Sequence, residues 1–208
     1  MFQKILLIAT VALVAGCSDP KAATEKNFKV VIQKTLDKAY PRCYITGNFP
    51  AVSDKFMLSK EKELKALVSA GLASVKDEPH EVKDWRGKTS TDIKPTYSLT
   101  EEGKKFYKAD AHKAIMGGTE GGICFGKGTV KDIKEFTEPS SAGGVQMTQV
   151  KYTYEVSDVP AWAKSAEILT AVPRLKQDVE SEKMSVDGMD VMVLTNNGWA
   201  SRGGGMGF

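Results

Sequence analysis

The sequence has few of the residues on which most catalytic and metal sites depend. Its 208 residues include only two histidines, His80 and His112, and three cysteines, none of which form a CxxC pair. Neither histidine lies near a Gly-x-Ser-x-Gly motif. We expect His80 to be an exposed loop residue and His112 a surface or helix-end residue. The sequence therefore predicts no catalytic, cofactor-binding or metal-binding residues.

A large excess of charge of one sign is also missing. The net charge is +3, from 29 basic and 26 acidic residues, and 41% of residues are apolar. A composition of this kind is typical of a globular protein with one domain or two small ones. So small a net charge provides no strong electrostatic attraction for nucleic acid or anionic lipid headgroups.

No apolar run is long enough to cross a membrane as a helix. The longest, Ile5 to Val14, has ten residues, which rise about 15 Å as a helix, half of a ~30 Å hydrocarbon core. Lys4 precedes the run, and the small residues Ala15 and Gly16 follow it. This order is typical of a signal peptide.

The end of this segment, Leu13-Val14-Ala15-Gly16-Cys17, resembles the lipobox of bacterial lipoproteins. The resemblance implies that residues 1–16 are removed as a signal peptide and that Cys17 receives a diacylglyceryl group and usually a further acyl chain such as palmitate. Two or three acyl chains hold a protein on a membrane durably, whereas one does not. Ser18 favours sorting to the outer membrane, facing the periplasm, whereas Asp19 leaves the inner membrane open.

Two cysteines are left once Cys17 is acylated. In the oxidising cell envelope, Cys43 and Cys124 are expected to form one disulfide. A closed loop of about 80 residues stabilises a fold by roughly 4 kcal/mol in the chain-entropy model. A reactive or metal-binding pair is the alternative, but no feature of the sequence supports it.

Helical spacing is clear soon after a short tether over residues 17–24. We expect a helix over residues 25–39, ended by Pro41. Its apolar positions recur at spacings of four, four and three: Phe28, Ile32, Leu36 and Ala39.

Residues 59–103 show a helix and a hairpin. The expected order is a helix from a Ser59 cap to Gly71, a strand over 72–75, a polar excursion over 76–94, a strand over 96–99 and a helix capped by Thr100. The residues at both ends, Leu64-x-x-Leu67-Val68-x-Ala70-Gly71-Leu72 and Tyr97-Ser98-Leu99-Thr100-Glu101-Glu102-Gly103, resemble winged-helix domains. The resemblance implies a winged-helix-like domain over residues 25–115. DNA binding is not carried over, because an exported lipoprotein meets no genome and the helix mixes Lys with Glu.

The second half is rich in predicted strands. Gly117–Gly122 lacks the Gly-Lys-Ser/Thr ending of a phosphate-binding loop, so we interpret it as a linker. Segments 123–136 and 145–156 are predicted to pair as a hairpin, with a bulge near Gly126 and Gly128. A short helix is expected over 164–171, a hairpin turn at Asp187-Gly188 and a flexible tail over 201–208. We therefore expect an α+β fold, with an antiparallel sheet domain over 122–200 packed on the winged-helix-like half.

The function suggested by this combination is a membrane-anchored envelope lipoprotein that binds a protein or an envelope component without catalysing a reaction. Trp85 and Arg86, within the polar excursion, are the candidate partner contacts, since an exposed tryptophan favours binding. The other aromatic residues are interpreted as core rather than as the lining of a ligand groove. Two alternatives remain: a cell-envelope hydrolase that uses paired carboxylates, and a periplasmic inhibitor or resistance factor.

Overall fold

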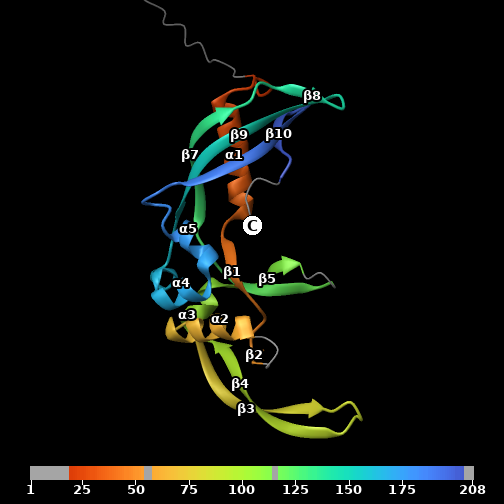
Figure 1. The fold of residues 1–208 in the computed structure, drawn as a ribbon, viewed down its shortest axis with the longest axis vertical. Coiled ribbons are helices and arrows are strands. Elements are labelled where there is room, and N and C mark those ends of the chain that lie inside the picture. The colour runs from red at the N-terminus through yellow and green to blue at the C-terminus, as the bar shows by residue number, and fades with distance from the viewer. Residues whose placement is uncertain (1–18, 54–57, 114–116, 204–208) are drawn as a thin grey trace, which may run out of the picture.

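A computed structural model describes residues 19–53, 58–113 and 117–203 of the chain. The chain forms a mixed α and β structure with antiparallel sheets, one of them curled into a half-barrel. The molecule is elongated, with the start of the first helix at one end and a long hairpin at the other (Figure 1). The mixed composition and the antiparallel pairing confirm the predicted fold class at this level, whereas the domain boundaries stay predictions.

The half-barrel is formed by the C-terminal strands. Its order is β11 (Gly198–Ser201), β10 (Val186–Thr195), β9 (Val145–Ser157) and β7 (Lys127–Phe136), and the short β8 (Ser140–Ala142) also pairs with β9. Along β9, Val150, Tyr152, Tyr154 and Val156 are buried. The alternation predicted for this strand and its pairing with β7 are therefore confirmed.

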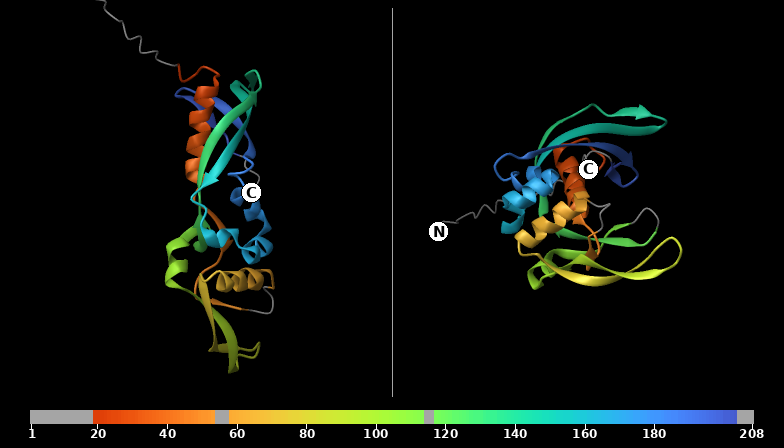
Figure 2. Two further views of the ribbon diagram at one scale, coloured as in Figure 1. Left: turned by 90° about the vertical axis from the view of Figure 1, so that its left-hand side faces the viewer. Right: turned by 60° about the horizontal axis from the view of Figure 1, so that its bottom comes forward.

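Helix α1 (Glu25–Ala39) lies in the hollow of this sheet (Figure 2). The side chains of Phe28, Ile32 and Leu36 are fully buried there, and α1 packs mainly against β7 and β11. The Thr24 hydroxyl caps the helix by accepting a hydrogen bond from the backbone N–H of Asn27 at 3.3 Å. At the far end of the chain, the Trp199 indole donates to the carbonyl oxygen of Lys21, at 3.1 Å.

A second core lies between two other sheets and several helices. It is built around α2 (Leu58–Ser69), which packs mainly against α4 (Ala166–Ala171) and β3 (Ala73–Lys83). Beside it lies a three-stranded sheet of order β1 (Arg42–Thr46), β6 (Thr119–Phe125) and β5 (Tyr107–Lys113). Three further short helical segments flank or follow α4 in the sequence: η1 (Ala161–Lys164), η2 (Pro173–Leu175) and α5 (Lys176–Val179).

The long hairpin consists of β3 (Ala73–Lys83) and β4 (Thr89–Leu99), and β2 (Ala51–Val52) pairs with the other edge of β4. Register is regular from Ala73 opposite Leu99 to Lys83 opposite Thr89. The polar excursion predicted over 76–94 is therefore mostly strand. Its polar residues are compatible with a β-hairpin because this part of the hairpin is largely exposed on both faces.

Helix α3 (Glu101–Phe106) begins at the predicted Thr100 cap. The Thr100 hydroxyl accepts from Gly103 N–H at 3.1 Å and donates to the Gly71 carbonyl at 2.7 Å, and Thr100 N–H donates to the Leu72 carbonyl at 3.0 Å. This joins the start of α3 to the end of α2. Any side chain at Gly103 would collide with the Leu72 carbonyl oxygen, so only glycine fits the close approach.

The turn predicted at Asp187-Gly188 and the linker predicted over Gly117–Gly122 are wrong for the same physical reason. Asp187-Gly188 lies within β10, and Thr119–Gly122 belongs to β6. A side chain at Gly188 would collide with the Tyr152 ring, and one at Gly121 with the Tyr107 ring. These glycines make room for an aromatic ring inside a sheet rather than forming a turn.

Three further local predictions change. The bulge expected near Gly126 is the point where the chain leaves one sheet for another, and Gly126 has φ +89°. Ser59 lies within α2 rather than in front of it, and Ser201 belongs to β11, not to a tail. The helix expected over 164–171 is confirmed in shortened form, because Ser165 caps it at Ala166.

Candidate functional site

The predicted lipid attachment residue, Cys17, lies outside the described residues, as does Ser18. Acylation of Cys17 therefore stays a prediction. Within the described parts of the chain, no helix combines the length and the apolar character needed to cross a bilayer.

The disulfide between Cys43 and Cys124 is present, as predicted. The two cysteines lie opposite each other on the paired strands β1 and β6, with their Cα atoms 3.9 Å apart. The bond therefore fastens two neighbouring strands of one sheet that are 81 residues apart in the sequence.

Trp85 and Arg86 lie at the tip of the β3–β4 hairpin. The Trp85 side chain is 86% exposed, and the Arg86 guanidinium lies 4.4 Å from the centre of its ring. The Asp84 carboxylate fixes the turn by accepting from the backbone N–H groups of Arg86 and Lys88, both at 2.9 Å. An exposed aromatic ring is thus held on an ordered turn.

Exposed apolar residues continue along the hairpin. Val75 is 43% exposed on β3, and Ile93, opposite Pro79, is 62% exposed on β4. Because residues two apart on a strand point to the same side, Val75, Pro79 and Ile93 share one face. We call this face, together with Trp85 and Arg86 at the tip, the hairpin surface.

The two histidines are apart and have separate surroundings. His80 lies in β3 rather than in a loop, half-buried, with Nε2 2.7 Å from the Thr96 hydroxyl. His112 lies exposed in β5, which replaces the helix end expected before it. The described residues bring together no group of three or more His, Cys, Asp or Glu side chains suited to a metal ion.

Two pairs of nearby carboxylates, the kind of group that the hydrolase alternative needs, take part in local structural contacts. Glu101 and Glu102 form ion pairs with Lys104 and Lys105, each at 2.5 Å, one turn along α3. In β10, Asp187 is exposed whereas Asp190 is buried and accepts from the Ser201 hydroxyl at 2.5 Å. These pairs stabilise a helix start and a strand edge.

A buried cluster around Asp178 was missed at the sequence level. The Asp178 side chain is 1% exposed, and its Oδ2 atom accepts from the Tyr40 hydroxyl at 2.7 Å, from Arg42 Nη1 at 3.0 Å and from the Tyr44 hydroxyl. Burial, and next the charge of Asp178, raise the pKa of both tyrosine hydroxyls, so both stay protonated donors. Burial lowers the pKa of Arg42, but Asp178 and the tyrosines outweigh it and the pKa is raised.

The donor residues of this cluster have a recognisable sequence pattern, whereas its acceptor does not. Tyr40, Arg42 and Tyr44 alternate, as residues on one face of an extended segment do. Their acceptor lies more than 130 residues away, in the segment 174–180, which no predicted element covers. No spacing rule joins two segments so far apart.

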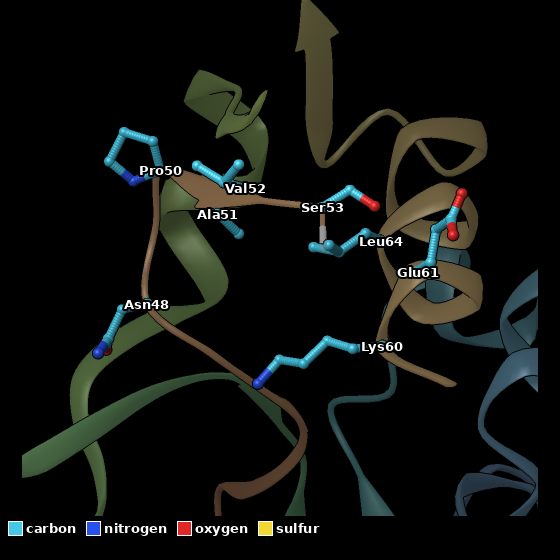
Figure 3. Close-up of a pocket in the computed structure, with 8 residues that line it drawn as sticks. All are labelled: Asn48, Pro50, Ala51, Val52, Ser53, Lys60, Glu61 and Leu64. Carbon is cyan, nitrogen blue, oxygen red and sulfur yellow. The ribbon is translucent and has the colours of Figure 1, made fainter. Parts of the chain in front are cut away.

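A pocket of about 250 Å³ lies between β2 and α2 (Figure 3). Among the described residues that line it, two are charged and both have partners: Lys60 pairs with Glu120 at 3.0 Å and Glu61 with Lys65 at 2.8 Å. One of its lining residues, Ser53, is also the last described residue before the gap at 54–57. We therefore assign no ligand to it.

Comparisons with known proteins add no family to this picture: no family model matches the chain, and neither the curated proteins nor the solved structures give a match.

Proposed function

We propose that this protein is a lipid-anchored lipoprotein of the bacterial envelope that binds a protein or envelope component through the hairpin surface. The anchor is the acylated Cys17, and the outer membrane, facing the periplasm, is the expected location. The protein acts by binding, not by catalysis.

The proposal of an anchor is supported by two independent features. One is the signal peptide and lipobox over residues 1–17. The other is the Cys43–Cys124 disulfide, since stable disulfides are usual in the periplasm and rare in the cytosol.

The binding role is supported by one observation above the others, the 86% exposure of Trp85 on an ordered turn. Leaving a tryptophan ring in water is unfavourable unless a partner covers it, and tryptophan and arginine are enriched among the residues that dominate binding energy. The hairpin also lies at the opposite end of the molecule from the start of α1 (Figure 1).

We also propose that the hairpin and its neighbours form a winged-helix-like module. Support comes from the order of elements, α2 followed by the β3–β4 hairpin, and from the pairing of β2 with β4. The first helix departs from the predicted unit over 25–115, because α1 packs mainly against β7 and β11. On this proposal, the wing serves as the binding arm.

The experiment is cross-linking in living cells followed by mass spectrometry, with Trp85→Ala compared against Met184→Ala. Met184 is the matched control because it is also an exposed apolar side chain, 75% exposed, outside the hairpin. Truncating a tryptophan at the centre of an interface costs about 2 kcal/mol or more, roughly a 30-fold change in Kd. We expect Trp85→Ala to lose the dominant cross-linked partner and Met184→Ala to keep it.

The anchor is tested separately with a palmitate analogue and the Cys17→Ser variant. An unlabelled protein whose Cys17→Ser form fractionates as before would refute the anchor. A labelled protein with no Trp85-dependent partner would refute the binding role alone. If the partner is a soluble enzyme that the protein inhibits, the inhibitor alternative is favoured.

A further inference from the structure

A cavity of about 430 Å³ opens beside the Asp178 cluster, where α1, β1, β5 and the η2–α5 segment meet. Its volume is within the range of sites that hold small organic ligands. The basic side chains in its lining come from four separate elements: Lys38, Arg42, His112 and Arg174. Of the described residues that line it, none has a carboxylate.

The positive charge at this cavity is only partly neutralised. Asp178 is buried and forms an ion pair with Arg42, so it neutralises one positive charge although it does not line the cavity. Among the ion pairs of the described chain, none includes Lys38 or Arg174. Burial raises the pKa of the nearby Glu63, and the charge of Arg174 lowers it by less, but Glu63 is not among the residues that line the cavity.

Both guanidinium groups are held in place by the fold. Arg42 is fixed by Asp178, whose oxygen is in turn bound by two tyrosine hydroxyls. Arg174 donates from Nη2 to the Tyr44 carbonyl oxygen. An arginine fixed in advance loses less conformational entropy when it binds a carboxylate or a phosphate, and its planar fork matches either group.

The rest of the lining is suited to the body of an organic molecule. Ala39, Pro41 and Ala111 provide apolar surface beside the basic groups, and Gln177 adds an amide. A fully hydrated inorganic ion gains little binding free energy from apolar surface. An organic anion with a short apolar body gains binding free energy both from the basic side chains and from the apolar surface.

We propose that this cavity binds a small organic anion, with its carboxylate or phosphate group held by Arg174 and Lys38 and its apolar part against Pro41 and Ala111. The group can belong to a free metabolite or to a lipid headgroup, since the chemistry is the same. The inference is independent of the hairpin surface and of the lipid anchor.

The test is a binding titration of the purified protein by calorimetry. The probes are benzoate, phenyl phosphate and a dihexanoyl phosphatidic acid kept below its micelle concentration, with benzyl alcohol as the uncharged comparison. We expect saturable binding of an anion that weakens as NaCl is raised, and no saturable binding of benzyl alcohol. Tighter binding of the phosphatidic acid would identify a lipid headgroup, and tighter binding of benzoate or phenyl phosphate a free anion.

The variants are Arg174→Gln and Lys38→Gln, with Arg86→Gln as a control that removes the same charge at the distant hairpin tip. Losing a charged hydrogen-bond donor should raise Kd about tenfold or more for Arg174→Gln, and losing an exposed charge should raise it about threefold to fivefold for Lys38→Gln. Arg86→Gln should leave Kd unchanged.

Because Arg174 also contacts the Tyr44 carbonyl, Lys38→Gln keeps the test valid if Arg174→Gln unfolds. Absence of saturable anion binding, or equal Kd values for Lys38→Gln and Arg86→Gln, would overturn the proposal.

Discussion

Asp178 connects α5 to the segment that joins α1 to β1. Its Oδ2 atom accepts hydrogen bonds from Tyr40, Arg42 and Tyr44, so a five-residue stretch is fastened to a residue 134 to 138 positions later. A buried carboxylate is unfavourable in itself, and it becomes tolerable when charged and hydroxyl donors surround it. The cluster therefore specifies how the chain passes from one core to the other.

Replacing Asp178 with Asn should lower the free energy of unfolding by about 3 kcal/mol, as expected when one partner of a buried ion pair is removed. This value is at the low end of the range of about 3–5 kcal/mol for breaking a buried ion pair, because the Arg42 side chain is 19% exposed and keeps some contact with water. Urea denaturation measures the change, with Asp187→Asn, an exposed site in β10, as the control. A loss below 1 kcal/mol would show that the cluster adds little to stability.

Stability should also fall at alkaline pH. Burial is the main cause that raises the pKa of Tyr40, Tyr44 and Tyr152, in Tyr152 to about 12. Unfolded tyrosines ionise near pH 10, so above that pH the unfolded state holds fewer protons than the folded state and the free energy of unfolding falls as pH rises. The stabilisation that comes from these raised pKa values is fully present below pH 10. It is lost as the pH rises toward the pKa of the tyrosines in the folded state.

The measurement is urea denaturation at several pH values from 9 to 11.5, with absorbance of tyrosinate recorded alongside. Tyr152→Phe should make the decline above pH 10 shallower, by about 1.4 kcal/mol per pH unit at most. Equal slopes for the variant and the unchanged protein would contradict this assignment.

At the scale of elements, the start of α3 shows how a sequence motif becomes a contact. Thr100 caps α3 and also binds the carbonyl groups of Gly71 and Leu72. Gly103 then lies against the Leu72 backbone with no space for a side chain. Thr100 and Gly103 are therefore explained by the docking of α3 on the end of α2.

Gly103→Ala should destabilise the protein by about 1–3 kcal/mol, despite the higher helix propensity of alanine, because the added methyl group forces the two backbones apart. Lys104→Ala, at an exposed position of the same helix, should change stability by less than about 0.5 kcal/mol. Thermal unfolding of both variants measures the difference. A more stable Gly103→Ala protein would show that α3 does not pack this closely.

The features of the elements that could be predicted from the sequence are those that depend on residues close together in the chain. The Thr100 cap, the face of α1 and the alternation of β9 depend on neighbouring residues, and each is confirmed. The turn expected at Asp187-Gly188 was wrong because the reason for Gly188 is the ring of Tyr152 on the neighbouring strand. The Asp178 cluster and the basic cavity were missed because each joins segments that only the tertiary fold brings together.

At the scale of the whole molecule, the first and the last described segments of the chain meet at the start of α1. The Trp199 indole donates to the Lys21 and Ala22 carbonyl groups, and its ring lies 5.3 Å from that of Phe28. Strand β11 thus closes the half-barrel over the first turns of α1, next to the predicted tether.

Trp199→Ala should lower the free energy of unfolding by about 3–5 kcal/mol, since the 7% exposed ring leaves a cavity that the sheet cannot fill. Trp85→Ala removes an equally large side chain from an exposed site and should change stability by no more than about 0.5 kcal/mol. Guanidinium denaturation of the two variants makes the comparison. Similar losses in both would mean that Trp199 does not help to close the half-barrel.

The position of α1 has a consequence for the order of events during biosynthesis. A chain that emerges from a ribosome or a translocon with its N-terminus first delivers Phe28, Ile32 and Leu36 long before Val150 and Trp199, which cover them. For that interval the helix segment is amphipathic and uncovered, beside a tether that ends at the bilayer if Cys17 is acylated. Chaperones or the lipid surface itself would have to shield it until the last strand arrives.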